Sequence, residues 1–97
     1  MDYQENKLTK IRNKARRLGI LGEIEESPRL QKKYRITRPN GQVIDFGDSG
    51  FEDWWDHRDP IRRASYLKRA KGIRDGSGRL TANDKSSANY YAIRLLW

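Results

Sequence analysis

The sequence predicts a small single domain of the α+β class. Three observations lead to this: an apolar stripe of helical period near the start of the chain, a tight turn between two β-prone runs, and two further helical segments beyond that turn. Helices and strands that are segregated along a chain, rather than alternating, are typical of α+β proteins. With 97 residues the chain has room for one modest core, so we expect residues 1–97 to form one small basic domain.

A basic amphipathic helix is predicted over residues 2–18. Its apolar stripe, at three- and four-residue steps, consists of Leu8, Ile11, Ala15 and Leu18. Asp2 and Glu5 have the spacing of a capping box at its start, and Gly19 offers the left-handed stop at its end. The pattern leaves open whether this helix packs on the domain or forms a separable arm of residues 1–18.

A β-hairpin is predicted over residues 34–46, with its turn at Pro39-Asn40-Gly41. A two-residue loop would pair Ile36 with Asp45 and mix polar and apolar side chains on both faces. A three-residue loop places the large apolar groups on one face and an ion pair on the other, and we expect this cleaner pattern to set the register. The pairs are then Tyr34 with Phe46, Arg35 with Asp45, and Ile36 with Ile44.

A central helix is predicted over residues 60–71. Asp59 suits its cap and Pro60 its first position, while Gly72 marks its end. The apolar side that we expect it to bury consists of Ile61, Ala64, Leu67 and Ala70.

The remaining segments give weaker signals. Residues 20–25 suit a short strand before the hairpin, and residues 51–55 suit a short helical turn or an irregular aromatic anchor. Residues 75–78 (Asp-Gly-Ser-Gly) form a turn. A final helix over residues 88–97, capped by Ser86-Ser87, is favoured over a strand because its apolar residues recur at four-residue spacing.

Composition limits the class of protein. The chain has no cysteine, so it has neither a disulfide nor a thiolate metal site. Its hydrophobic fraction of 35% is low, and we expect its three Trp, five Tyr and two Phe to anchor the core. It contains no apolar run of the ~20 residues that a membrane span needs, and its first residues are polar and acidic, unlike a signal peptide. We therefore expect a soluble intracellular protein without a membrane partner.

Charge is distributed unevenly around a formal net charge of +8. Residues 1–18 carry six bases against two acids, residues 45–59 carry six acids against one base, and residues 60–74 carry six bases and no acid. Two basic helices thus flank an acidic middle. A field of this sign attracts phosphate-rich polymers and acidic protein faces.

We predict that the two basic helices contact nucleic acid through its phosphates, without reading the bases. The candidate nucleic-acid-binding residues are Lys7, Lys10, Lys14, Arg17, Arg62, Arg63 and Arg69. An acidic viral or host protein surface is the alternative partner of these bases. The structural alternative is that the same bases are merely solvated, as on many amphipathic helices.

A second class of function is a protein-interaction module. In that class the side chains of Trp54, Trp55 and Trp97 would be interface anchors, because tryptophan is favoured at binding hot spots. Buried rings in the isolated domain would favour nucleic-acid contact, and a wet aromatic patch would favour the interaction module.

The sequence contains few residues that suggest an enzyme active site. His57 lies between acids, but such a histidine more often caps, pairs or packs than catalyses. A metal-dependent nuclease would need the carboxylates of Asp48, Asp53 and Asp56 together around a cation. The better interpretation is that these acids pair with nearby bases. We therefore predict no enzyme activity, no catalytic residue, no metal site and no cofactor.

Residues 33–97, roughly two-thirds of the chain, resemble a family of short, functionally uncharacterised proteins encoded by large DNA viruses and bacteriophages. The residues that carry the resemblance are Lys33-Tyr34, Gly41, Phe46-Gly47, Asp53, His57, Asp59, Arg62-Arg63, Tyr66-Leu67-Lys68-Arg69, Ile73-Arg74-Asp75, Asn89-Tyr90-Tyr91 and Leu96-Trp97. The chain departs from that family at Ala70-Lys71-Gly72, where a histidine-containing segment is more usual. The resemblance implies a viral or phage protein located in the virion or the host-cell cytoplasm, and it brings no catalytic residue.

Overall fold

The computed structural model describes residues 3–97, with side chains described from residue 6 onward. The helices and strands are α1 (Tyr3–Arg17), β1 (Glu23–Glu26), β2 (Lys32–Thr37), β3 (Val43–Asp48), α2 (Trp54–His57), α3 (Pro60–Ala70), a 3₁₀ turn (Thr81–Asn83) and α4 (Ala88–Tyr91), which a π-helical segment (Ala92–Leu96) continues. The capping box expected from Asp2 and Glu5 lies outside the described part of the chain.

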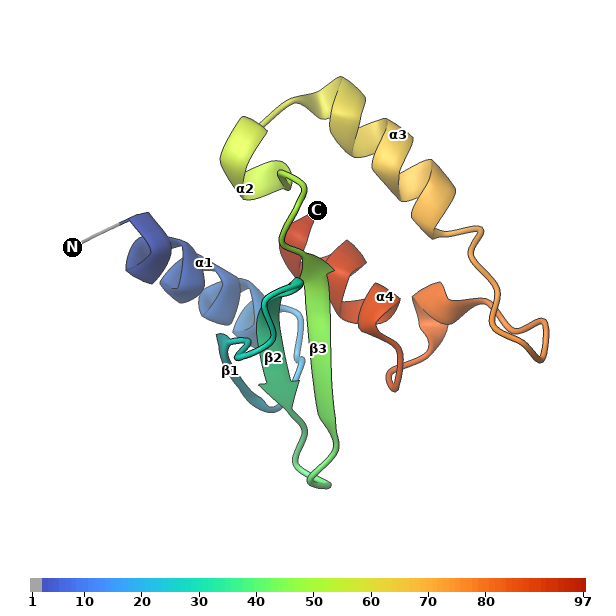
Figure 1. The fold of residues 1–97 in the computed structure, drawn as a ribbon, viewed down its shortest axis with the longest axis horizontal. Coiled ribbons are helices and arrows are strands. Elements are labelled where there is room, and N and C mark those ends of the chain that lie inside the picture. Colours follow the sequence, from blue (N-terminus) through green and yellow to red (C-terminus); the bar gives the residue numbers. More distant parts are fainter. Residues whose placement is uncertain (1–2) are drawn as a thin grey trace.

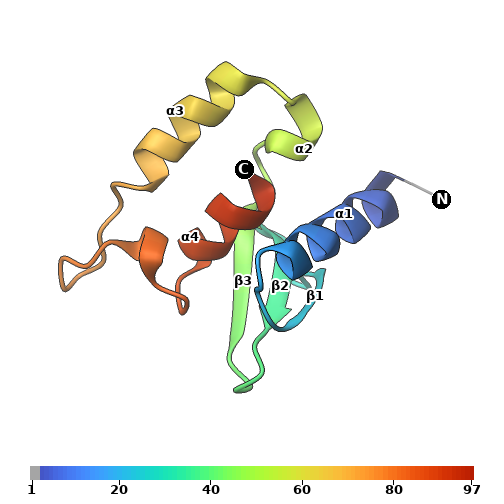
Figure 2. The ribbon, with the colours of Figure 1, turned by 180° about the vertical axis from the view of Figure 1, so that it is seen from behind.

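The fold is α+β, as the sequence predicts. Three antiparallel strands form one sheet in the order β1-β2-β3. Figure 2 shows α1 and the C-terminal helix in front of this sheet, so both cover the same face of it. The short helix α2 lies beyond one end of β3 and leads into α3 at the edge of the molecule (Figure 1).

The hairpin has the predicted register. Tyr34 pairs with Phe46 and Arg35 with Asp45. Arg38 donates its backbone N–H to the carbonyl of Gln42, so three residues form the loop. Gly41, the last residue of the loop, has a φ of +88°, the left-handed conformation that glycine adopts readily.

The core lies between the sheet and the two helices that cover it. Its buried members are Ile11, Ala15, Ile24, Tyr34, Ile36, Ile44, Phe46, Tyr91, Leu95, Leu96 and Trp97. Two of these belong to α1, so the first helix packs on the domain and is not extended as an arm. Leu18 departs from the expected stripe and is exposed, because it follows the last residue of α1.

The first strand begins later than predicted, at Glu23 rather than Ile20. The backbone N–H of Ile20 donates to the carbonyl of Ala15 and that of Gly19 to Arg16, so both residues still close the end of α1. A strand cannot begin until this capping is complete.

The central helix has its predicted start but buries another side. Asp59 caps α3 by accepting from the backbone N–H groups of Ile61 and Arg62. The expected apolar side is wrong in its first half, since Ile61 and Ala64 are exposed. The packed residues are Tyr66, Leu67 and Ala70, which meet a small second cluster containing Ala82 and Ile93. The reason is that α3 lies at the edge of the molecule and touches it mainly through its C-terminal half.

The C-terminal segment is helical, and the alternative strand is wrong. Ser87 caps it by accepting from the N–H of Asn89. The four apolar residues with four-residue spacing, Tyr91, Ile93, Leu95 and Trp97, are all buried. Between residues 3 and 97 no helix is long and apolar enough to cross a membrane.

Candidate functional site

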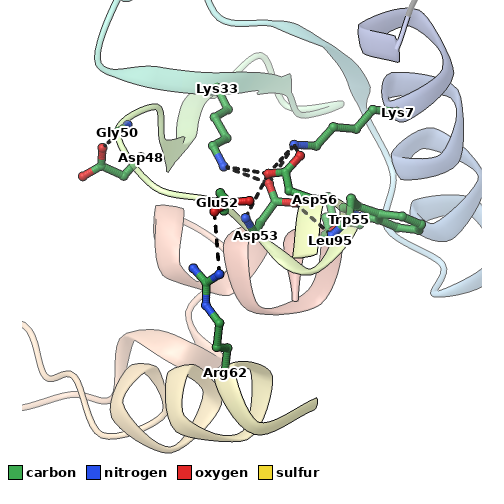
Figure 3. A network of polar contacts seen from close by, with 10 residues as sticks. All are labelled: Lys7, Lys33, Asp48, Gly50, Glu52, Asp53, Trp55, Asp56, Arg62 and Leu95. Carbon is green, nitrogen blue, oxygen red and sulfur yellow. Dashed lines mark hydrogen bonds and ion pairs between the residues drawn. The ribbon is translucent and has the colours of Figure 1, made fainter. Parts of the chain in front are cut away.

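Two lysines and two aspartates form a polar cluster within the fold, which we call the buried ion cluster (Figure 3). Lys7 of α1 lies 3.0 Å from Asp53 and 3.1 Å from Asp56. Lys33 of β2 lies 2.9 Å from Asp53. The side chains of Lys7 and Asp53 are only 4% and 2% exposed. The cluster therefore joins α1, the sheet and α2.

Asp53 also starts α2. Its carboxylate accepts from the N–H of Trp55, and Asp56 accepts in return from the N–H of Asp53. This reciprocal capping box explains why residues 54–57 become a helical turn. The helical turn expected over residues 51–55 therefore begins later, at Trp54, because Asp53 is its cap.

The buried ion cluster corrects one prediction, for Lys7, and confirms another, that acids of the middle segment pair with bases. Lys7 was a candidate nucleic-acid-binding residue, but its ammonium is buried against two carboxylates and cannot reach a phosphate. Asp53 and Asp56 hold lysine ammonium groups where a metal-dependent nuclease would hold its cation. Within the described residues no group of three acids or histidines could hold a metal ion.

The other acids of the middle segment are also partly neutralised. Arg35 donates to Asp45 at 2.8 Å, and this bond, with help from Ser27 and Arg29, holds the pKa of the Asp45 carboxyl below its ordinary value. Glu52 lies 3.7 Å from Arg62, with both side chains largely exposed. The acids of residues 45–59 thus neutralise some of the bases of the chain and leave others unpaired among the described residues.

Three cations from three elements converge on two neighbouring rings, and we call this group the cation–tryptophan cluster. The ammonium of Lys14 lies 5.8 Å from the centre of the Trp55 ring. The Arg58 guanidinium lies 5.1 Å from Trp55 and 5.9 Å from Trp54, and that of Arg63 lies 5.3 Å from Trp54. These distances are those of cation–π contacts.

Hydrogen bonds fix the members of this cluster to the core. The indole N–H of Trp55 donates to the carbonyl of Leu95 at 2.7 Å. The guanidinium of Arg63 donates to the backbone carbonyl of Trp97. The Trp55 ring is thus held by a hydrogen bond, and the Trp54 ring packs against the core beside it.

Arg58 has an unusual backbone. Its φ of +53° makes it the one non-glycine residue with a positive φ in the described chain, and it ends α2 by donating its N–H to the carbonyl of Trp54. The left-handed conformation costs a residue with a Cβ about 1–2 kcal/mol. A left-handed residue is common at the end of a helix, and non-glycine residues held in this conformation also recur at functional sites.

The electrostatics of the cation–tryptophan cluster are unbalanced. Burial of the Lys14 ammonium, together with repulsion from Arg63 and Arg17, lowers the pKa of this lysine below its ordinary value. None of the ion pairs found in the described part of the chain includes Lys14, Arg58 or Arg63. An anion placed beside these cations would relieve their repulsion.

The structure brings together only some of the predicted residues. Lys14 and Arg63 belong to the cation–tryptophan cluster, and Arg17 lies close enough to Lys14 to affect its pKa. Lys10 is exposed one turn before Lys14 on the same side of α1. The two others, Arg62 and Arg69, line a separate groove beside α3.

Sequence reasoning missed Arg58. As a single base among acids, it resembled a partner for its neighbours rather than a member of a basic surface. The only signal was its position three residues after Trp55, and its left-handed backbone cannot be read from the sequence.

The third tryptophan is not a free anchor. Trp97 is 8% exposed and stacks on Tyr66, with ring centres 4.1 Å apart. His57 packs against the same ring and accepts from the N–H of Asp59 at Nδ1, while its buried Nε2 has no hydrogen-bond partner among the described residues. Both residues therefore support the fold.

The fold and the site define a small basic α+β domain with a cation-rich aromatic surface. The chain belongs to a family of unknown function, DUF5754, which it matches over residues 22–70. The match spans β1 to α3 and includes Trp54, Trp55, Arg58 and Arg63. It leaves out α1 and the C-terminal helix.

No curated protein matches the chain. No solved structure matches it either. The family description says nothing of a viral or phage origin, so that resemblance stays a hypothesis.

Proposed function

We propose that this protein is a non-enzymatic nucleic-acid-binding protein that contacts the phosphate backbone. The proposed surface consists of Lys10, Lys14, Arg17, Arg58 and Arg63. One observation carries the proposal: three cations gather on Trp54 and Trp55, and none of them belongs to an ion pair with a carboxylate side chain of the described residues.

The cost of assembling these cations supports a phosphate ligand. Lys14 is partly buried beside two arginines, and Arg58 keeps a strained backbone that places its guanidinium on both rings. Like charges that are held together are stabilised when an anion binds between them. A phosphate suits a guanidinium because two of its oxygens can accept two parallel N–H bonds from the same arginine. Binding would also release the counterions of the nucleic acid.

The rings themselves are poor platforms for bases. Single-strand binders stack bases on exposed aromatic faces. Here Trp54 and Trp55 are partly buried and have cations over them. This arrangement favours binding that is independent of base sequence.

The protein-interaction alternative based on the three tryptophans is weaker, because Trp97 is buried and Trp54 and Trp55 pack against the core. A virion or a host-cell cytoplasm remains the setting that the viral resemblance suggests, and that part of the proposal rests on the resemblance alone.

The test is the affinity for a duplex DNA of random sequence, measured by fluorescence anisotropy near 0.1 M salt. Arg58→Gly removes one phosphate contact and should weaken binding roughly tenfold. Because glycine relieves the left-handed backbone, the free energy of unfolding should stay within about 1 kcal/mol of the original protein's. Loss of affinity without loss of stability separates a binding role from a structural one.

The matched control is Arg79→Ala, which removes an equal charge from the exposed segment that follows α3. Its affinity should fall no more than about threefold, the effect of a general loss of charge. Equal losses in the two variants, or no DNA binding by the original protein, would refute the proposal. Binding of an acidic protein but not of DNA would favour the acidic-surface alternative.

A further inference from the structure

A groove separates α3 from the rest of the domain. It has a volume of about 500 Å³ and runs between α3 and the end of β3 with the loop that follows. Its apolar lining includes Phe51, Ile61, Tyr66, Ile73, Leu96 and Trp97. The groove lies along α3, whose first half leaves Ile61 and Ala64 exposed rather than packed in the core.

The lip of this groove is unusually apolar. Phe51 is 71% exposed, Ile61 is 77% exposed and Ile73 is 50% exposed, and all three line it. Single exposed apolar side chains are ordinary, but several around one concave surface mark a binding site. The three residues come from the loop after β3, the start of α3 and the segment after α3, so no local sequence pattern gathers them.

The two sides of the groove carry opposite charges. Arg69 lines the α3 side and Asp48 the opposite side. In the described part of the chain neither belongs to an ion pair, whereas Arg62 and Glu52 pair loosely with each other. A ligand complementary to this groove therefore needs an apolar stripe with an acid on one side and a base on the other.

We propose that the groove binds an amphipathic helix of a partner protein. An apolar stripe at positions i, i+4 and i+7 would cover Phe51, Ile61 and Ile73, an acidic side chain would meet Arg69, and a basic side chain would meet Asp48. The 11 residues of α3 extend about 16 Å, enough to lie beside a helix of three turns. This site is separate from the nucleic-acid surface, because Arg62 and Arg69 line the groove whereas Arg63 lies on Trp54.

The probe is a synthetic helical peptide of about three turns, with leucines at i, i+4 and i+7, a glutamate on one side and a lysine on the other. Titrated against the full chain and followed by NMR, it should bind with a dissociation constant of roughly 10–100 μM. The shifted signals should include Phe51, Ile61 and Ile73.

Charge reversal gives the sharpest outcome. Arg69→Glu should weaken binding at least about tenfold, and a peptide with lysine in place of its glutamate should restore it. The matched control is Lys68→Glu, since Lys68 is exposed on the same helix and does not line the groove. This control should change the affinity less than about twofold, because surface pairs at a distance are screened.

Three outcomes would overturn the proposal. The first is no binding at about 1 mM peptide. The second is a loss in Arg69→Glu that the charge-reversed peptide does not restore. The third is a dimer in analytical ultracentrifugation that Ile61→Lys dissociates, which would show that a second copy of the chain covers the groove.

Discussion

At the scale of single residues, Asp53 joins three parts of the structure. Its carboxylate caps α2, pairs with Lys7 of α1 and pairs with Lys33 of β2. The cost of burying two ammonium groups is offset only while the carboxylates keep their charge.

We expect Asp53→Asn to lower the free energy of unfolding by about 3 kcal/mol, because it leaves buried lysines without full compensation. Asparagine still accepts at the cap, so the loss reports on the charge rather than on the start of α2. Urea unfolding followed by tryptophan fluorescence measures it. The control Glu52→Gln should cost less than about 1 kcal/mol, since Glu52 and Arg62 are both exposed. A similar cost for both variants would contradict this account.

The pairing of Lys7 could not be foreseen from the sequence. Its partner Asp56 lies 49 residues away, and only the packing of α1 on the sheet brings the two together. By its local pattern Lys7 is equivalent to Lys10, which is exposed, and to Lys14, which is partly buried against Trp55. The charge of a residue can be read from the sequence, but whether a distant acid forms an ion pair with that residue depends on the fold.

At the scale of elements, local signals predicted the hairpin and the extent of α3, but not which side of α3 is buried. The hairpin register follows from the turn and from the alternation of apolar and polar side chains in the two strands. These signals lie within a few residues of each other, so a local pattern is enough to set the register. The period of α3 was read correctly, but its buried side depends on which neighbours lie beside it. Ile61 shows the difference, because it continues the stripe and yet is exposed.

Two glycines of the hairpin separate backbone strain from crowding. Gly41 and Gly47 have φ values of +88° and +81°, but a Cβ on Gly41 would meet nothing, whereas one on Gly47 would lie 2.6 Å from the Leu96 side chain. Gly41→Ala should cost about 1–2 kcal/mol. Gly47→Ala should cost about 2–4 kcal/mol, because Leu96 is buried and cannot give way. Thermal and urea unfolding measure both, and a cost for Gly41→Ala equal to that for Gly47→Ala would count against the predicted collision.

The cross-strand pair of Arg35 and Asp45 gives the hairpin a pH dependence. Because Arg35 lowers the pKa of Asp45 in the folded state, this pair contributes stability above the ordinary aspartate pKa of about 3.9, and the contribution is lost as the pH falls through the lower folded value. Asp45→Asn should therefore be less stable than the original protein at pH 7, with a smaller further loss between about pH 4 and 2. Urea unfolding curves at several pH values in this range test the prediction. If the free energy of unfolding falls equally with pH in the original protein and in Asp45→Asn, the pair does not cause the pH dependence.

At the scale of the whole molecule, the net charge of +8 overstates what a ligand would meet. Lys7 and Lys33 are bound by Asp53 and Asp56, and Arg35 is bound by Asp45. Among the bases outside the ion pairs of the described residues, three lie on the tryptophans and Arg69 lies beside the groove, while others such as Arg74 and Lys85 are exposed elsewhere. The distribution of charge, rather than its sum, should therefore set the strength of nucleic-acid binding.

The dependence of DNA affinity on salt measures this distribution. If the five cations of the proposed surface each neutralise one phosphate, the logarithm of the binding constant should fall with the logarithm of salt with a slope of about −4 to −5. Arg58→Gly should make that slope shallower by about 1, while Arg79→Ala should leave it unchanged. A slope near −8 would mean that bases across the whole surface take part, and a slope that Arg58→Gly does not alter would place the phosphates elsewhere on the molecule.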